Sequence, residues 1–318
     1  MKALNILFLS ISILSASSYI YSQSSFQVVP LGIRGGTDES NLSAYMLAPV
    51  GRNEYICLDA GTVHTGIKKA IALNTFHEPP AVILRKYIKG FFISHGHLDH
   101  LAGMIINSPD DSVKNIYALP FVLDILKEKY FSWKSWANFA DAGEAPLLKK
   151  YHYVVLDTAV EIAIANTNMS VKTFVLSHVH PYQSSAFLIQ YNENYVLYLG
   201  DTGADTIEHS QRLRQLWQAI APLINDKKLK GIFIETSFPD EQPDKQLFGH
   251  LTPHLLMNEM KVLSGFCKNP NALNGLPVII THIKPNGNSE LKIKTQLAKS
   301  NSFKLKLIFP QQGKKINL

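Results

Sequence analysis

Cysteine is scarce in this chain, which has 318 residues and only two cysteines, Cys57 and Cys267. Two cysteines so far apart in sequence do not define a disulfide framework, although one bridge between them is conceivable in an exported protein. Both are expected in the core. Neither is close in sequence to a histidine-rich segment, so a thiolate ligand to a metal is not expected.

The sequence also lacks short-period repeats, low-complexity linkers and any break in composition that would mark a second domain. Hydrophobic residues make up 46% and charged residues 18% of the chain, a composition that is typical of globular proteins and excludes a disordered or fibrous one. The length is sufficient to bury a large core. We therefore predict a single domain over residues 23–318.

The apolar run at the N-terminus, residues 4–14, is too short to remain in a membrane as an anchor. Lys2 precedes this run and small residues follow it, which is the order of regions in a secretory signal. We predict a signal peptide over residues 1–22 with cleavage between residues 17 and 23, and hence an exported, periplasmic or secreted protein. The alternative is a buried N-terminal helix or strand.

The net charge of +6 has no single concentrated source. Part of the excess lies in two lysine-rich stretches, residues 227–230 and 292–315, which favours a solvated face over a groove for nucleic acid. The charge supports only a weak attraction for anionic substrates. A nucleic-acid polymer is therefore not an expected partner.

The most informative stretch is residues 94–103, which follows a short apolar run. It contains His95, His97, Asp99 and His100, and packing alone does not account for so many polar side chains at the end of an apolar strand. Imidazole nitrogens and carboxylate oxygens suit zinc, and a site with open coordination positions is more often catalytic than structural. The sequence therefore predicts a metal site here, against the alternative of a polar loop with scattered histidines.

This pattern, an apolar strand that ends at a histidine or a carboxylate, recurs several times along the chain. These strand ends lie at His95, His178, Asp201, Glu235 and His282. Open α/β and mixed sheets place their sites at one edge, so we expect these side chains to converge there.

Periodicity and turn residues predict the remaining elements. We expect strands over residues 26–31, 42–48, 55–58, 91–93, 116–118, 154–156, 171–176, 187–191, 195–199, 231–234 and 277–280, and helices over residues 66–73, 82–87, 101–107, 121–130, 211–223 and 253–264. Asp59 follows one of these strands. It is expected either to orient a metal-binding histidine or to cap the next helix.

The order of these residues resembles that of metallo-β-lactamase-fold hydrolases: the cluster from His95 to His100, a histidine near position 180, Gly200-Asp201 and Thr281-His282. The resemblance implies an α/β (α+β) fold, a four-layer αββα sandwich, with two divalent metal ions at the edge between its sheets. Zinc is the expected metal.

The same resemblance implies a set of ligands. His95 and His97 bind the first ion with a third histidine, Asp201 bridges, and the second ion is bound by the remaining set: Asp99, His100 and His282. The third histidine of the first ion is left open. His178 ends its strand as the other ligands do, whereas His180 has the spacing that is usual in the wider fold.

A narrower resemblance concerns the substrate. The run from His95 to Pro109 resembles the signature of class II 3′,5′-cyclic-nucleotide phosphodiesterases, and Glu235-Thr-Ser-Phe and Gly249-His-Leu-Thr-Pro253 also resemble that family. This resemblance implies hydrolysis of cyclic AMP, with cyclic GMP as a second candidate, to 5′-nucleotides by a hydroxide bound between two metals. The expected partner is thus a small cyclic nucleotide.

The segment from His250 to Thr252 is similar to the His-x-Thr segment of the tRNA 3′-processing nucleases, whose histidine contacts the reacting phosphate. The similarity implies that His250 protonates the leaving oxygen, that Glu235 orients His250 and that Thr252 contacts substrate. Asp99 completes the predicted catalytic residues. The alternative for His250 is a histidine satisfied at the start of a helix.

The segment over residues 131–150 is rich in aromatic residues but has no clear period. Trp136, Asn138 and Phe139 are predicted to line the wall that contacts the base of the substrate, since an aromatic loop can stack a flat ring. The alternative is that these side chains belong to the core.

Two other functions compete with this prediction. The first is another hydrolase of the same fold, namely a different phosphodiesterase, a lactonase, a β-lactamase or an RNA-processing enzyme, because fold alone does not exclude it. The second is a non-catalytic metal-binding protein. A β-lactamase has no need for the segment from His250 to Thr252, and a full ligand set with open positions argues against simple metal storage.

Overall fold

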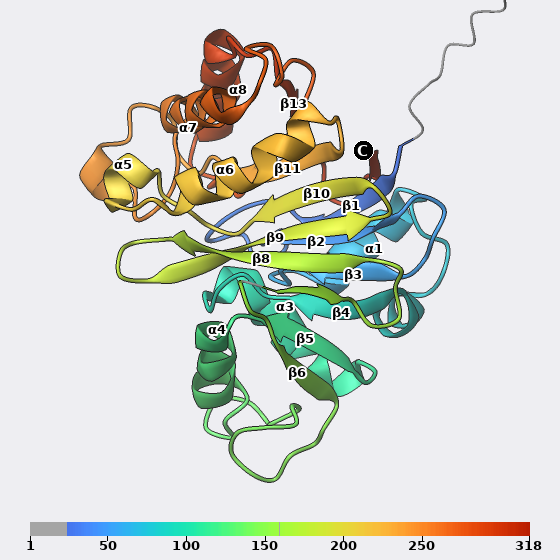
Figure 1. The fold of residues 1–318 in the computed structure, drawn as a ribbon. Coiled ribbons are helices and arrows are strands. Elements are labelled where there is room, and N and C mark those ends of the chain that lie inside the picture. Colours follow the sequence, from blue (N-terminus) through green and yellow to red (C-terminus); the bar gives the residue numbers. More distant parts are fainter. Residues whose placement is uncertain (1–23, 159) are drawn as a thin grey trace, which may run out of the picture.

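The structure is a computed structural model that describes residues 24–158 and 160–318. Two β-sheets face each other, and helices cover the outer face of each sheet (Figure 1). The predicted signal peptide over residues 1–22 lies outside the described residues.

The strands of the described chain are β1 (Phe26–Gly32), β2 (Ala44–Pro49), β3 (Tyr55–Leu58), β4 (Ile88–Phe92), β5 (Lys114–Ala118), β6 (Tyr151–Val155), β7 (Glu161–Ala163), β8 (Ser170–Ser177), β9 (Gln183–Tyr191), β10 (Asn194–Leu199), β11 (Leu229–Glu235), β12 (Pro277–Thr281), β13 (Lys306–Ile308) and β14 (Ile316–Asn317). The α-helices are α1 (His64–Ala72), α2 (Pro80–Val82), α3 (Leu98–Asn107), α4 (Pro120–Ile125), α5 (Asp205–Glu208), α6 (Arg212–Asn225), α7 (Pro253–Phe266) and α8 (Ser289–Ser300). Short turns of other helix types are η1 (Ile83–Tyr87), η2 (Ser108–Asp110), η3 (Leu126–Tyr130) and η4 (Asp244–Gln246).

Each sheet has seven strands, in the orders β14-β1-β2-β3-β4-β5-β6 and β13-β12-β11-β10-β9-β8-β7. Strands β3 to β6 are parallel to one another, and so are β10 to β13. Strand β8 runs in the same direction as β10 because both are antiparallel to β9. Residues that follow β4, β8, β10 and β12 therefore emerge at the carboxyl ends of strands, where sites of such sheets lie.

Three apolar clusters separate the four layers. One lies between the second sheet and helices α6, α7 and α8, and another lies between the first sheet and helices α1, α3 and α4. The third is built by strands of both sheets and fills the space between them. The inner strands are thus covered on both faces, which explains why β10 and β12 read as continuous apolar runs instead of alternating ones.

The predicted αββα sandwich is confirmed by this arrangement. Helix α8 differs from the expectation, because it forms in the lysine-rich stretch near the C-terminus where no element was expected, and the short elements β7, α5, β13 and β14 were not expected either. Residues 131–150 contain no helix or strand, which agrees with their lack of a clear period. Both cysteines are free; Cys57 is buried, whereas Cys267 is partly exposed. Over the described residues, every helix is too short or too polar to cross a membrane.

Candidate metal centre and active site

Five strand ends deliver polar side chains to one edge of the sandwich. His95 lies three residues after β4, His178 directly follows β8, and Asp201 lies two residues after β10. Glu235 is the last residue of β11, and His282 directly follows β12. All five side chains are buried and belong to groups whose nitrogen and oxygen atoms converge. The expected convergence of the strand ends is present in the structure.

The first group consists of His95, His97 and His178, whose ligand atoms lie within 4.8 Å of one another. His95 and His178 are buried, and His97 is exposed. His180 is exposed instead, and its backbone N–H donates to Glu208 Oε2 (2.8 Å). In the described part of the chain it joins none of the candidate groups. Of the two alternatives, the geometry thus favours His178 as the third histidine.

The second group consists of Asp99, His100 and His282. Asp201 lies between the two groups, because its Oδ2 is 3.3 Å from His100 Nε2 and 3.2 Å from His282 Nε2. The same oxygen is 3.8 Å from His95 Nε2 and 3.9 Å from His178 Nε2. Four imidazoles from three segments of the chain therefore point Nε2 at one carboxylate oxygen.

Each of these four imidazoles has its other nitrogen, Nδ1, held by a different group. His100 Nδ1 lies 2.7 Å from Asp59 Oδ2, and His95 Nδ1 lies 3.0 Å from Ser94 Oγ. His178 Nδ1 lies 2.9 Å from the carbonyl oxygen of Gly249, and His282 Nδ1 lies 3.0 Å from Ser237 Oγ. Such partners fix the tautomer and the orientation of metal-binding histidines.

Asp59 therefore takes the first of the two roles expected for it. Its carboxylate also accepts hydrogen bonds from the backbone N–H of Ser94 (2.8 Å), from Ser94 Oγ (2.8 Å) and from the hydroxyl of Tyr198 (2.6 Å). Helix α1 begins after Val63 without a side-chain cap. The network around Asp59 ties the turn after β4 to strand β10 in the other sheet.

Two nitrogens of the cluster face Asp201 Oδ2 but make no well-directed hydrogen bond. In the part of the chain that the structure describes, Nε2 of His95 and Nε2 of His100 are buried without a hydrogen bond. A buried polar atom without a partner costs free energy, so such atoms are rare unless an ion or water satisfies them. Imidazole nitrogens with nearby carboxylate oxygens are a donor set that divalent transition metals accept. The residues present thus fit divalent metal ions.

The charges of the cluster are balanced internally. Burial lowers the pKa of His178 to about 4 and holds the pKa of His95 well below its usual value, so both rings are neutral and keep a lone pair. Burial alone would raise the pKa of Asp99 and Asp201, but His100 and His282 outweigh it and keep both carboxylates ionised. Burial would lower the pKa of His100, but the carboxylates of Asp201 and Asp59 outweigh it and raise that pKa well above its usual value. His95 and His178 therefore present neutral nitrogens beside a cationic His100 and charged oxygens.

His250 lies between the two groups. Its ring centre is 5.0 Å from that of His178 and 5.1 Å from that of His282. Its Nδ1 lies 2.7 Å from Glu235 Oε1, while Glu235 Oε2 accepts a hydrogen bond from Ser237 Oγ (2.6 Å). Burial lowers the pKa of His250, but the Glu235 carboxylate outweighs burial, and the net shift is upward. An imidazole whose pKa is raised and whose Nδ1 is engaged by a buried carboxylate can donate a proton from its other nitrogen, Nε2.

Two adjacent glycines let the loop after β1 approach the second group. A Cβ atom at Gly35 would lie 2.2 Å from the ring of His282, so only glycine fits there. Gly36, at φ +87°, donates its N–H to Asp99 Oδ2 (2.9 Å). The backbone N–H of His282 in turn donates to the carbonyl of Ile33 (3.1 Å). The N-terminal segment thus forms one wall of the site.

Two tyrosines that the sequence patterns did not single out also support the site. Tyr182 stacks on His97, with ring centres 4.9 Å apart and planes 5° apart, and its hydroxyl accepts the N–H of Gly96 (3.1 Å). The hydroxyl of Tyr130 donates to the carbonyl of Gly96 (2.8 Å). A polar aromatic residue within a few positions of a ligand histidine is the only sequence signal that would have pointed to Tyr182.

The residues predicted to bind substrate lie in other surroundings. Trp136 Nε1 donates to Ser108 Oγ (3.1 Å), and Ser108 directly follows α3, a helix of ten residues and about 15 Å whose first turn holds Asp99. Asn138 is buried, and its side-chain amide forms hydrogen bonds to the backbone of its own loop. Phe139 packs against the apolar cluster of the first sheet.

Asn138 and Phe139 thus lie in or against the core, as the alternative describes, whereas Trp136 is exposed. Thr252 is buried as well, and its Oγ1 caps α7 by accepting the N–H of Leu255 (3.4 Å). The Asn138 amide is thus engaged within its own loop, whereas the Thr252 hydroxyl accepts one hydrogen bond and keeps its O–H as a donor. None of these four residues belongs to a candidate metal group among the described residues.

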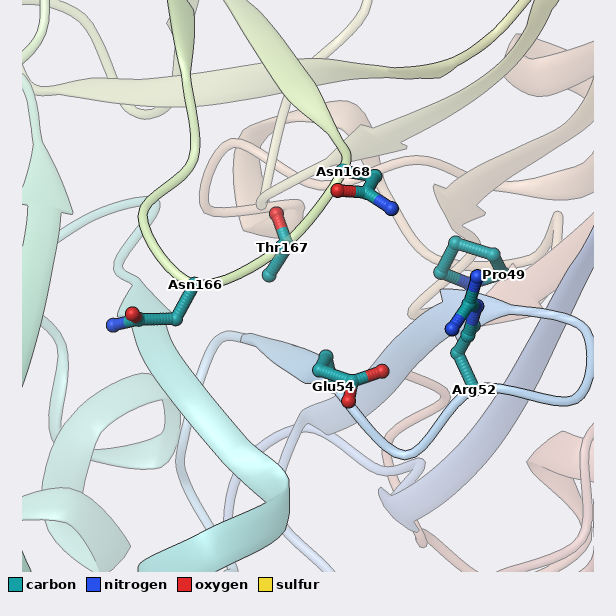
Figure 2. Close-up of a pocket in the computed structure, with 6 residues that line it drawn as sticks. All are labelled: Pro49, Arg52, Glu54, Asn166, Thr167 and Asn168. Atoms are coloured by element: carbon teal, nitrogen blue, oxygen red, sulfur yellow. The ribbon is translucent and has the colours of Figure 1, made fainter.

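A separate hollow lies at the other end of the sheets. It has a volume of about 310 Å³ and is lined by the turns that connect β2 to β3 and β7 to β8: Pro49, Arg52, Glu54, Asn166, Thr167 and Asn168 (Figure 2). Strand β3 begins beside this hollow and ends next to Asp59, and β8 likewise leads from it toward His178. The hollow is therefore a full strand length away from the histidine cluster.

Comparisons with known proteins agree with this geometry. The model of the family described as class-II cAMP phosphodiesterases matches residues 80–313. The chain belongs to this family. A 3′,5′-cyclic-nucleotide phosphodiesterase of Aliivibrio fischeri is 41% identical over 315 residues, which cover 94% of this chain and 95% of that protein. The predicted class II family is thus confirmed.

Solved structures support the fold. Unliganded yeast PDE1 superposes with a TM-score of 0.83 at 22% identity, covering 93% of this chain and all of that one. A metallo-β-lactamase fold protein from Bacillus subtilis, YhfI, superposes with a TM-score of 0.62 at 14% identity, again over 93% of this chain and 100% of that one. This member of the class II phosphodiesterase family therefore has the predicted sandwich of the metallo-β-lactamase fold.

Proposed function

We propose that this chain hydrolyses 3′,5′-cyclic nucleotides, cyclic AMP and also cyclic GMP, to 5′-nucleotides at the histidine cluster. The observation that carries the proposal is the position of His250, a buried histidine paired with Glu235 and flanked by both candidate metal groups. Membership of the class-II cAMP phosphodiesterase family supports the choice of substrate. The curated relative from Aliivibrio fischeri carries the name 3′,5′-cyclic-nucleotide phosphodiesterase.

The proposal includes two divalent ions, most simply zinc. One would be held by His95, His97 and His178 and the other by the second group, with Asp201 between them. Such a pair supplies a water of lowered pKa and neutralises the oxygens of the phosphodiester. The side chains that hold the imidazoles, Asp59 foremost, keep each Nε2 directed inward.

In the reaction, a water oxygen forms a bond to phosphorus and the bond from phosphorus to the 3′ oxygen breaks. An alkoxide is a poor leaving group unless it receives a proton. His250 gives that proton from Nε2, because its Nδ1 is engaged with Glu235. Glu235 raises the pKa of His250 and holds the ring still, aided by the hydroxyl of Ser237 and the N–H of Thr202 (3.0 Å).

The direct test is to incubate the purified, metal-loaded protein with cyclic AMP, cyclic GMP, bis(p-nitrophenyl) phosphate and nitrocefin. Release of 5′-AMP from cyclic AMP with no cleavage of nitrocefin is the expected result. Cleavage of nitrocefin without turnover of either cyclic nucleotide would overturn the proposal.

The role of His250 is tested by His250→Ala. Loss of a general acid lowers turnover about 10² to 10⁴-fold, and the metal content should stay full because His250 is not among the proposed ligands. His254→Ala is a matched control, since His254 is exposed and lies four residues further along. A loss of bound metal in His250→Ala would reassign His250 as a ligand.

Export is also part of the proposal, on the strength of the N-terminal sequence. Mass spectrometry of the protein recovered outside the cytoplasm should give an N-terminus between residues 18 and 23. An intact Met1 on all of the protein would contradict it.

A further inference from the structure

We propose that Lys284 is a phosphate-binding residue, and that it binds the 5′-monophosphate product more strongly than the cyclic substrate. This inference rests on the proposed function and adds a residue that neither the motifs nor the resemblance selected. Lys284 follows His282 by two positions, and its backbone N–H donates to the carbonyl of Ser237 (3.2 Å). Ser237 is the residue that also holds His282 and Glu235.

The ammonium group of Lys284 lies at the second group of the cluster. A Cβ atom built on Gly36 would be 3.8 Å from Lys284 Nζ, and the N–H of Gly36 lies 2.9 Å from Asp99 Oδ2. Standard backbone dimensions then place Nζ within about 10 Å of the Asp99 carboxylate. The ammonium group therefore lies on the wall of the site that Gly35 and Gly36 form, beside the second group.

The side chain is also held in a defined direction. Its half-buried stem brings Nζ to 5.8 Å from the ring centre of Phe238, and the ring of Phe238 lies 5.8 Å from that of His250. A cation over an aromatic face at this distance is attracted to it. Lys284, Phe238 and His250 thus form a continuous row from the rim of the site to the proposed proton donor.

The charge of Lys284 has no carboxylate partner within the described ranges, 24–158 and 160–318. Nearby cations differ in this respect, because Arg34 and Lys294 both bind Glu290. Gly36 has no side chain that could cover the ammonium group. An uncompensated, partly desolvated cation beside a cluster that handles a phosphodiester is suited to bind an anionic oxygen.

The charges of substrate and product make the proposal specific. A cyclic nucleotide carries one negative charge on its phosphate, whereas a phosphate monoester carries about −1.5 to −2 at pH 7. A single cation therefore gains more from the product than from the substrate. We expect Lys284 to contribute more to product binding than to the Michaelis constant.

The experiment compares Lys284→Met with Lys284→Arg and with Lys299→Met, a control that removes one positive charge from the exposed end of α8. Calorimetry measures the binding of 5′-AMP to each metal-loaded protein, and steady-state kinetics with cyclic AMP gives KM and kcat. Bound metal is measured for every variant. Because the two ligands are assayed separately, binding and hydrolysis are separated.

Hydrogen bonds to charged groups contribute enough for Lys284→Met to raise the Kd of 5′-AMP about 10 to 100-fold, with a smaller rise in KM for cyclic AMP. Lys284→Arg should stay within a few-fold of the parent protein, and Lys299→Met should change neither constant. Equal changes in Lys284→Met and Lys299→Met, or a loss of metal in Lys284→Met, would overturn the proposal. If the parent protein binds 5′-AMP through Lys284 but does not hydrolyse cyclic AMP, the proposed function fails and the phosphate site stands.

Discussion

Two clusters of charged side chains are buried in this molecule, and they differ in whether their polar atoms have partners. In the cluster beneath the first sheet, Lys114 Nζ pairs with Asp111 Oδ1 (2.7 Å) and donates to the carbonyl of Leu84 (2.7 Å). The hydroxyl of Tyr151 donates to Asp111 Oδ2 (2.8 Å). In the histidine cluster, by contrast, Nε2 of His95 and of His100 have no hydrogen bond in the described chain.

The contrast distinguishes a structural cluster from a binding site. A buried ion pair that is complete needs nothing further and maintains the packing around it. A buried cluster whose nitrogens converge on one carboxylate and remain unbonded is complete only when another species enters. The two clusters should therefore respond differently to mutation: one through the stability of the fold and the other through the affinity for metal.

The largest effect is expected from Lys114→Met. Removal of the ammonium group leaves Asp111 buried and charged with no cation beside it and with only the Tyr151 hydroxyl and the N–H of Ser112 as partners, which should lower the free energy of unfolding by about 3–5 kcal/mol. Urea denaturation measures this, and the bound metal per folded chain should not change. The double variant Asp111→Asn with Lys114→Met should recover most of the loss. Unaltered stability of Lys114→Met would show that the ion pair is not a structural element.

A smaller effect, on metal affinity instead of stability, is expected from Asp59→Asn. The amide no longer supports His100 Nδ1 as the carboxylate does, and loss of such a partner typically weakens metal binding about 10 to 100-fold. Asparagine tolerates the positive φ of 52° at this position, so the backbone should hold. Competition with a chromophoric chelator measures the affinity.

Tyr198→Phe is the matched control for Asp59→Asn, because it removes one hydrogen bond to Asp59 and keeps the carboxylate. Its metal affinity should lie between those of the parent protein and Asp59→Asn. If Asp59→Asn lost stability but kept full metal affinity, the histidine cluster would have to be regarded as structural.

The smallest effect is expected from an exposed pair that belongs to neither cluster. Hydrogen bonding by Lys294, together with Arg34, holds the pKa of Glu290 below its usual 4.5. The folded-state pKa is the lower one, so the stabilisation is present above pH 4.5 and disappears as the pH falls through the folded-state value. Glu290→Gln should cost about 0.2–1 kcal/mol at pH 7 and nothing near pH 2 by urea denaturation. A constant difference at both pH values would contradict this.

The site residues in the turn after β4 could be predicted from the sequence. Those that come from other strands could be predicted only in part. His95, His97, Asp99 and His100 lie within six positions, so their types and spacing indicate a metal site directly. His178 could not be separated from His180, because each is a single histidine near the end of a strand. The choice depends on a three-dimensional fact, the contact between His178 Nδ1 and the carbonyl of Gly249.

Other features were outside the reach of local patterns. Helix α8 buries only Ile293 and Leu297, so its apolar face is too sparse among lysines to predict a helix. The aromatic segment over residues 131–150 was interpreted by composition, and composition does not say which face of the molecule a ring packs on. Tyr182 lies a few positions from His178, which is a weak signal, but its stacking on His97 is a tertiary contact. The approach of Lys284 to Gly36 is also a tertiary contact, for which one sequence holds no signal.

The close fit of Gly35 against the ring of His282 has a consequence for how the protein is made. Residues near the beginning of the chain and residues near its end touch at this point, and the backbone of His282 is fastened to Ile33. A ribosome-bound chain that has not yet extended past His282 lacks that side of the pocket, whatever has already folded. Assembly of the pocket is therefore among the last events of biosynthesis, and any truncated product that ends before this histidine is inert.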